Sequence, residues 1–268
     1  MATLSTTNPT LADVSARMTP DGKIDPNIVE MLNETNEVLL DMTVIEANGF
    51  TEHKTTVRSG LPSGTWRKLN YGVQPEKSRT VSVKDSMGML ETYAEVDKAL
   101  ADLNGNSAAW RLSEERAFIE GLNQTMATTL FYGDASLDPE KFTGLAPRYN
   151  SLSAENGMNI ISGSGSGSDN ASIWLVVWGP NTCHGIYPKG SPAGLQSRDL
   201  GEDTLLDAAG GRYQGYRTHH KWDIGFTLRD WRYVARIANI DVSDLTKNAA
   251  SGADLIDLMT QAIEVIPN

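Results

Sequence analysis

Apolar residues recur with a helical period most clearly over residues 107–131, "SAAWRLSEERAFIEGLNQTMATTLF". Apolar residues, glycine and threonines share one stripe of this segment, whereas the glutamates lie off it. The stripe consists of Trp110, Ala117, Phe118, Gly121, Leu122, Thr125, Met126, Thr129 and Leu130. The pattern predicts a helix about 35 Å long, at about 1.5 Å per residue. Gly133 is placed to end this helix.

Two shorter amphipathic helices are predicted near the ends of the chain. The first covers residues 26–43 and begins at Pro26, a residue that suits the first position of a helix. The second covers residues 251–267, where Ser251 is placed as the cap and Pro267 as the stop. The polar residues that precede the first helix are expected to form an extended arm.

A different pattern covers residues 52–86, where polar residues alternate with β-branched ones and turn-forming residues lie between them. It predicts a long two-stranded β-hairpin with a broad tip. Because an isolated two-stranded hairpin is only marginally stable in water, this hairpin needs a surface to lie on. The pattern alone leaves open whether that surface is its own domain or a neighbouring subunit. Further strands are expected over residues 171–179 and within residues 222–241.

The composition is that of a globular, loop-rich α+β protein of 268 residues, with 40% apolar residues, 24 glycines and 11 prolines. The formal net charge of -11 disfavours nucleic-acid binding, because affinity for DNA comes mostly from cations that neutralise phosphates. The single cysteine excludes an internal disulfide framework and suits a reducing compartment. We expect no signal peptide and no transmembrane helix, because the apolar runs are too short.

The segment "GYRTHHKWD", residues 215–223, and the pair Cys183–His184 contain the residues that could carry chemistry. Adjacent side chains of a strand point to opposite faces, so His219 and His220 are not expected to share a metal ion. A dyad of Cys183 with His219 or His220, assembled across the fold, keeps a hydrolase or metalloenzyme open as an alternative. The chain has no nucleophile elbow, phosphate-binding loop or dinucleotide-binding motif. This favours a structural or binding role without catalytic, metal-binding or cofactor-binding residues.

Three segments in the second half of the chain carry a family resemblance: "GIYPKG" (185–190), "AGLQSRDLGE" (193–202) and "GFTLRDWRYVARIANID" (225–241). Two further segments, 91–103 and 116–134, fit the same family. Together with the order of the predicted elements, these segments resemble the major capsid (coat) proteins of tailed bacteriophages, which have the HK97-like fold. The resemblance covers most of the chain.

The resemblance implies an α+β, HK97-like capsid fold made of four parts. Residues 1–50 would be an N-terminal arm, and residues 51–88 an extended β-hairpin loop that lies over an adjacent subunit. Residues 89–170 would be a peripheral domain with the long spine helix, and residues 171–268 a mixed α/β axial domain. Chains of this family continue beyond such a domain and return to the peripheral one, whereas this sequence ends at Asn268. We therefore expect either a truncated chain or one that lacks the family's last segment.

The resemblance also implies the function: a major capsid protein, not an enzyme, that self-assembles as hexamers and pentamers into the icosahedral shell enclosing phage DNA. It implies a location in the virion after assembly in the host cytoplasm. Decoration (cement), scaffolding and portal proteins are further implied partners. Double-stranded DNA is enclosed without sequence-specific binding, and no membrane or cofactor is involved.

Aromatic and cationic residues of the predicted hairpin are the expected intersubunit contacts, because tryptophan and arginine are typical interface anchors. They are Arg58, Trp66, Arg67, Lys68, Tyr71 and Arg79. Three alternatives to the capsid function stay open. They are another virion structural protein such as a tail component, a monomeric binding module, and the Cys/His-dependent enzyme.

Overall fold

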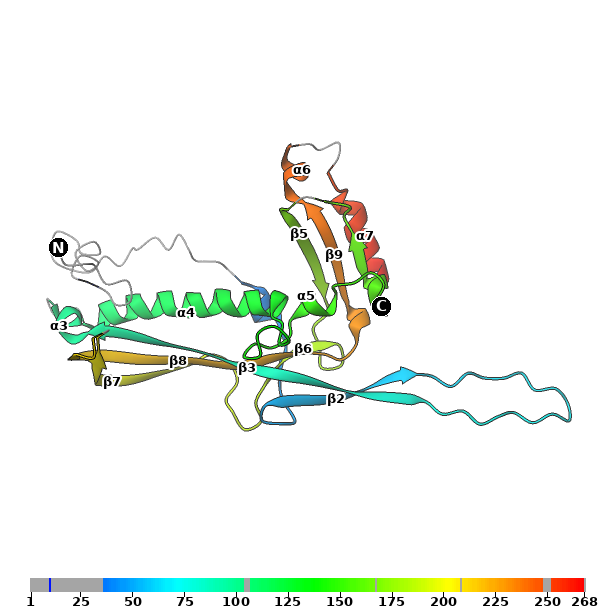
Figure 1. The fold of residues 1–268 in the computed structure, drawn as a ribbon, viewed down its shortest axis with the longest axis horizontal. Coiled ribbons are helices and arrows are strands. Elements are labelled where there is room, and N and C mark those ends of the chain that lie inside the picture. The colour runs from blue at the N-terminus through cyan, green and yellow to red at the C-terminus, as the bar shows by residue number, and fades with distance from the viewer. Residues whose placement is uncertain are drawn as a thin grey trace. The chain divides into compact units, whose positions relative to one another are not determined.

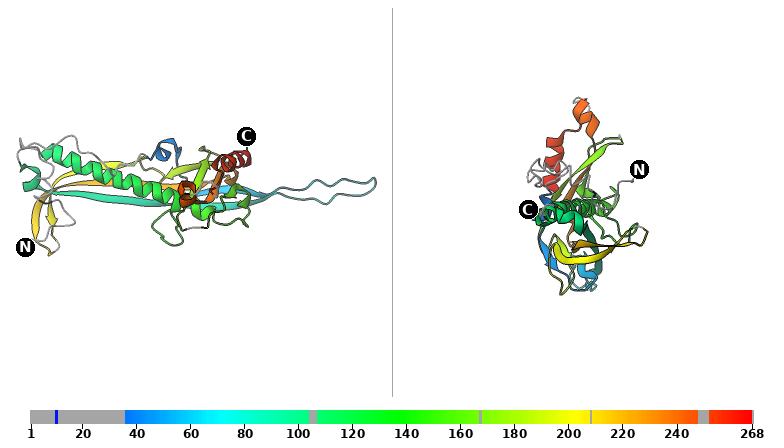
Figure 2. Two further views of the ribbon diagram at one scale, coloured as in Figure 1. Left: turned by 90° about the horizontal axis from the view of Figure 1, so that it is seen from above. Right: turned by 90° about the vertical axis from the view of Figure 1, so that its left-hand side faces the viewer.

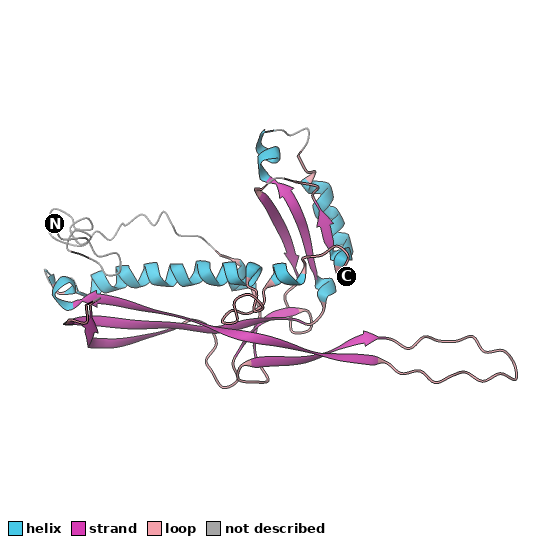
Figure 3. Ribbon diagram, in the orientation of Figure 1, coloured by secondary structure: helices cyan, strands magenta, loops and turns pink. Residues whose placement is uncertain are grey.

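Helices and strands are mixed along the chain, as the predicted α+β class requires (Figure 1 and Figure 3). The computed structural model describes residue 10 and residues 36–103, 107–166, 168–207, 209–247 and 252–267. Contacts divide the chain into two compact units. Unit 1 comprises Met1–Leu40, Met89–Thr128 and Pro192–Asp223, and unit 2 comprises Asp41–Gly88, Thr129–Ser191 and Ile224–Asn268.

The long predicted helix is confirmed as α4 (Ser107–Tyr132), most of which belongs to unit 1. It ends where the backbone N–H of Gly133 donates to a carbonyl of the last turn at 2.8 Å. Near the start of α4, Trp110 is buried with Val96 and Ala101 in an apolar cluster. The predicted apolar stripe therefore packs inward at this end of the helix.

Two long strands lie mostly in unit 1, and the sequence pattern predicted only the last part of the second one, within residues 222–241. β7 (Gln196–Leu206) and β8 (Arg212–Leu228) pair antiparallel, and β8 also neighbours β3 (Arg79–Asp97). Charged residues and glycines interrupt the alternation of apolar and polar positions in β7 and β8, so the signal for a strand is weak. Residues 192–223, which the sequence analysis placed with the axial region, thus share a unit with residues 89–128.

The predicted two-stranded β-hairpin is confirmed as β2 (Glu52–Gly60), paired antiparallel with the first part of β3. The views in Figure 2 show the two strands side by side. Beyond the paired stretch, every residue from 61 to 78 is exposed. At the end of the tip the N–H of Tyr71 donates to the carbonyl of Lys68 at 3.2 Å. Asn70 has a φ of 65° there, a left-handed conformation that asparagine tolerates.

Unit 2 contains a three-stranded sheet with the strand order β4-β9-β5. Its strands are β4 (Ile160–Ser162), β9 (Val234–Asp241) and β5 (Asn170–Val176). β5 and β9 lie in the segments predicted as strands. α7 (Leu255–Val265) packs on β9 and β4 (Figure 1). The fully buried centre of this packing consists of Ala235, Ile237, Ile240 and Ala262.

The two shorter predicted helices differ from their sequence patterns. α7 confirms the C-terminal helix but is capped by Asp254, whose carboxylate accepts two backbone N–H groups of the first turn. The predicted cap, Ser251, lies outside the described residues. Of the helix predicted over residues 26–43, the structure describes residues 36–43, and only α2 (Val38–Asp41) is helical there.

The remaining described elements are short. They are β1 (Val44–Glu46), α3 (Lys98–Ala101), α5 (Leu145–Arg148), η2 (Gly157–Asn159), β6 (Cys183–Tyr187), η3 (Trp231–Tyr233) and α6 (Val242–Lys247). β1 and β6 join the larger sheet, whose order is β1-β6-β8-β3-β2 with β7 paired to β8. Within the described residues, none of the helices is long and apolar enough to span a membrane.

A buried ion pair holds the root of the hairpin in unit 2. Arg148, at the end of α5, donates to the carboxylate of Asp85 on β3 at 2.7 Å, and the two side chains are 17% and 3% exposed. The other carboxylate oxygen of Asp85 accepts from the hydroxyl of Thr227 on β8 at 2.5 Å. Asp85 thus joins the hairpin to α5 and to β8.

Asp85→Ala is expected to lower the free energy of unfolding by about 3–5 kcal/mol, because it leaves the Arg148 guanidinium in a buried site without its counter-charge. Urea unfolding measures the change. The control is Lys84→Ala at the neighbouring position, whose ion pair with Glu52 is 59% and 48% exposed. Loss of that exposed pair should cost at most about 1 kcal/mol. Similar small losses in both variants would contradict the anchoring role of Asp85.

Candidate functional site

Cys183, the chain's only cysteine, opens β6 and is fully buried. Its thiol donates to the carbonyl of Val177 at 3.4 Å. Burial raises the pKa of the thiol to about 12, whereas a reactive cysteine needs a lowered pKa and a thiolate. This environment suits a core residue and does not suit a nucleophile.

His184, the next residue of β6, is almost fully buried as well. Its Nδ1 donates to the carbonyl of Gly179 at 3.2 Å, and its ring meets that of His53 edge-on, with centroids 6.0 Å apart. Burial is the main cause that lowers the pKa of both imidazoles. The two rings therefore pack as neutral groups inside unit 2.

His219 and His220 point to opposite faces of β8, as strand geometry predicted. His219 stacks on the ring of Tyr93 with centroids 4.5 Å apart, and its Nε2 lies 3.1 Å from the carboxylate of Glu91. His220 is fully buried, and its Nδ1 is hydrogen-bonded to the hydroxyl of Ser197 at 2.8 Å. In the part of the chain that the structure describes, no group of three His, Cys, Asp or Glu side chains could hold a metal ion.

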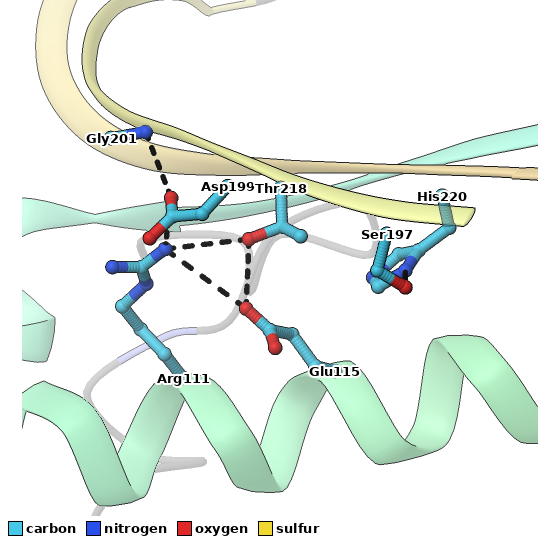
Figure 4. Close-up of polar contacts among 7 residues, drawn as sticks. All are labelled: Arg111, Glu115, Ser197, Asp199, Gly201, Thr218 and His220. Atoms are coloured by element: carbon cyan, nitrogen blue, oxygen red, sulfur yellow. Dashed lines mark hydrogen bonds and ion pairs between the residues drawn. The ribbon is translucent and has the colours of Figure 1, made fainter.

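A polar network joins α4 to β7 and β8 within unit 1 (Figure 4). Arg111 on α4 donates to the carboxylate of Asp199 at 2.6 Å and to the hydroxyl of Thr218 at 3.4 Å. That hydroxyl donates to Glu115, one helical turn after Arg111, at 2.7 Å. The hydrogen bond from Arg111 is the main cause that lowers the pKa of Asp199. Charge-assisted bonds therefore attach the helix to both strands.

The contact between Ser197 and His220 resembles a nucleophile with its base but lacks the rest of a hydrolase site. In such a site a third group orients the imidazole. Here the Nε2 atom of His220 is buried and has no hydrogen-bond partner among the described residues. Burial lowers the pKa of His220, and the nearby Glu115 carboxylate accepts from Thr218 instead. The arrangement supports packing of a neutral ring rather than proton transfer.

The six residues predicted at the intersubunit interface all lie on the hairpin and are exposed. Trp66 is 100% exposed and Tyr71 is 69% exposed, although aromatic side chains gain more than most from burial. Leu61 and Leu69 are exposed on the same tip. An exposed group of apolar side chains of this kind is typical of an interaction surface.

The hairpin is also basic. Residues 52–86 contain seven Lys and Arg against three Asp and Glu, a net charge of +4 in a chain whose total is -11. One of the three acids, Glu76, accepts from the backbone N–H of Ser63 at 2.7 Å and so joins the two arms of the tip. The tip therefore combines exposed apolar side chains with exposed cations.

A groove with a volume of about 460 Å³ lies between β3 and α4 within unit 1. Its lining residues are Leu90, Glu91, Thr92, Ala117, Phe118, Gly121, Leu122 and Thr125. The lining residues from α4 belong to the predicted stripe. One of them, Leu122, is buried. Ala117, Gly121 and Thr125 remain exposed along the groove. Sequence reasoning did not identify this groove, and the recurrence of small residues at every fourth position was the signal available.

Two comparisons with known proteins gave matches over most or all of the chain. The family model described as "Major capsid protein GP7" matches residues 19–268. A chain in the structure of Bacteriophage Epsilon15 is 41% identical with a TM-score of 0.79, and the match covers 100% of this chain and 81% of that chain. A search of curated proteins gave no match.

Two more distant structures share the fold. A chain of the SrpI encapsulin complex from Synechococcus elongatus PCC 7942 is 11% identical with a TM-score of 0.54, covering 88% of this chain and 98% of that chain. A chain in the capsid of Myoviridae Phage XM1 is 8% identical with a TM-score of 0.52, covering 80% and 94%. At these identities the likeness shows the fold alone.

The resemblance found in the sequence is therefore confirmed. The family model covers all but the first 18 residues, and a bacteriophage structure is 41% identical over the whole chain. The chain belongs to the family of the major capsid protein GP7, and it is a shell-forming virion protein of a tailed bacteriophage with the HK97-like fold.

Proposed function

We propose that the β2–β3 hairpin of each subunit binds a neighbouring subunit and so helps to hold together the hexamers and pentamers of the icosahedral shell. Trp66, whose side chain is completely exposed at the tip, is the observation that carries this proposal. A two-stranded ribbon has no second layer on which its tip could bury apolar side chains. Burial against another subunit removes that apolar surface from water, which is favourable.

Cations supply the second part of this contact. The predicted interface cations are Arg58, Arg67, Lys68 and Arg79. Each exposed ion pair contributes only about 0–1 kcal/mol, so these charges mainly steer and orient the approach. Trp66 and Tyr71 supply the apolar burial that keeps the contact closed. Since every subunit repeats the contact, modest energies add up over a shell.

We also assign the parts of the subunit. The N-terminal arm covers residues 1–50 and the extended loop residues 51–88, as the resemblance implies. α4 with β3, β7 and β8 forms the peripheral domain, and the three-stranded sheet with α7 forms the axial domain. Residues 192–223 move to the peripheral domain in this assignment, because they share a contact unit with residues 89–128.

We further propose that the subunit has no catalytic role. Support comes from the environments of Cys183, His184 and His220, which are buried and engaged in packing. The net charge of -11 supports a shell that encloses double-stranded DNA without binding it specifically, since like charges repel. Decoration, scaffolding and portal proteins are the further partners that we propose.

Trp66→Ala is expected to raise the protein concentration needed for half-maximal shell assembly by about tenfold or more, because it removes the apolar anchor. The Tm of the unassembled subunit should not change, since the side chain is fully exposed in it. Light scattering measures the assembly, and negative-stain electron microscopy identifies closed shells.

Leu137→Ala is the matched control, because Leu137 is 79% exposed but lies outside the hairpin. It should assemble like the wild type. Assembly of Trp66→Ala at the wild-type concentration would contradict the hairpin contact. Tubes or rings formed by the wild-type protein in place of closed shells would contradict the proposed organisation of hexamers and pentamers in an icosahedral shell.

Acidification is expected to destabilise the subunit through its buried histidines. Burial lowers the pKa of His53, His184 and His220 from the ordinary value of 6.5, so below that pH the unfolded chain binds more protons than the folded one. Their contribution to stability is therefore complete above pH 6.5 and is lost as the pH falls through the lowered pKa values.

Urea unfolding between about pH 8 and pH 5 measures this dependence. His220→Gln keeps a hydrogen-bonding group beside Ser197 but cannot titrate, so its stability should fall less steeply on acidification. A free energy of unfolding that rises as the pH is lowered over this range would show that the imidazoles are not buried as neutral groups.

A further inference from the structure

Two features of the described residues fit each other: the groove between β3 and α4, and the exposed side chain of Trp66. We propose that the groove of one subunit receives the indole of Trp66 from the hairpin of a second copy. The proposal rests on the hairpin contact proposed above and names the surface to which the hairpin binds.

The groove is open to solvent and has room for an aromatic group. Its volume of about 460 Å³ falls within the range of about 300–1,000 Å³ that is usual for sites of small organic groups. Phe118 on α4 and Leu90 on β3 supply apolar surface beside the buried Leu122. An indole placed there would exchange water for contacts with these apolar side chains.

Small side chains keep the groove open along the helix. Ala117, Gly121 and Thr125 recur at every fourth position of α4, so they follow one another along one side of it. A Cβ atom at Gly121 would meet nothing within 4 Å. Glycine is unfavourable in a helix interior, and here it leaves room for a bulky group from another molecule.

The hairpin presents Trp66 in a way that a second molecule can reach. The side chain is 100% exposed, and those of Leu61 and Leu69 on the same tip are 79% and 85% exposed. β2 and β3 remain paired as far as Gly60 and Arg79. The tip, which includes Trp66, therefore extends past the last paired residues of the two strands.

The charges of the two surfaces are complementary. Residues 52–86 carry a net charge of +4. Residues 89–128 and 192–223, which belong to the unit with the groove, contain 12 acidic and 7 basic side chains, a net charge of -5. Glu91 lies at the groove itself. Attraction between these surfaces would steer the tip toward the groove.

A second copy of the chain is the occupant that a shell places beside every subunit. A buried tryptophan accounts for about 150–250 Å², well below the area of about 800 Å² per partner in a stable two-body interface. A contact of this size holds two molecules together only as one of several. Subunits of a shell, each in contact with several neighbours, meet that condition.

Gly121→Leu tests the groove without altering the hairpin. The leucine fills the groove, so the concentration for half-maximal assembly should rise by about tenfold or more, as for Trp66→Ala. The Tm of the unassembled subunit should instead rise by about 2 °C, because leucine favours a helix more than glycine does. Gly121→Ala is the matched control: it favours the helix as well but adds a single carbon, and it should assemble nearly as the wild type does.

The outcomes separate the two proposals. If Gly121→Leu assembles like the wild type while Trp66→Ala is defective, the groove proposal is overturned and the hairpin contact stands. If both variants assemble normally, both proposals are overturned. A defect of Gly121→Leu together with normal assembly of Gly121→Ala supports the groove.

Disulfide crosslinking gives a second measurement that does not depend on the stability of these variants. One chain carries Thr65→Cys beside the tryptophan, and a chain of different size carries Thr125→Cys at the groove. Cys183 stays unreactive because it is buried and its thiol pKa is raised. Shells formed from the mixture should contain the crosslinked pair of unequal chains. Absence of this crosslinked pair from the shells overturns the proposal.

Discussion

A two-stranded ribbon cannot bury its own apolar side chains, and this constraint governs how the subunit works. Residues 61–80 are exposed throughout, with Trp66 at full exposure. The root of the same hairpin is held by the buried pair of Asp85 and Arg148. The hairpin thus combines an anchored root with an exposed tip that is apolar and basic. In the hairpin contact that we propose, assembly of the shell buries the apolar side chains that folding of one chain leaves exposed.

Residue types that often carry catalysis are used here in packing. Cys183 and His184 are buried in unit 2, and burial moves their pKa values away from the range in which a thiolate and an imidazolium would form. His220 contacts Ser197, but among the described residues no acid is hydrogen-bonded to its ring. The pattern of Cys, His and Ser along the sequence could not distinguish these environments from a reactive site, because reactivity depends on solvation and neighbours.

The long helix α4 makes different kinds of contact along its length. At its start Trp110 joins the apolar cluster of unit 1. Arg111 and Glu115 bind polar groups of the neighbouring strands. Gly121 and Thr125 lie beside the open groove. Periodicity placed Trp110, Gly121 and Thr125 on a single stripe, and only the position of β3 decided which part of that stripe is covered.

The sequence by itself determined α4, the hairpin, the strand β5, the C-terminal helix and the family, because each is encoded in neighbouring residues or in contiguous segments. It also determined that His219 and His220 face opposite ways, which follows from strand geometry alone. Only the tertiary structure decided the pairing of β7 with β8, where polar and charged residues obscure the alternation. It alone brought Asp85 to Arg148 and opened the groove beside Gly121. Contacts of this kind join residues far apart in the chain, and no local pattern of side chains specifies them.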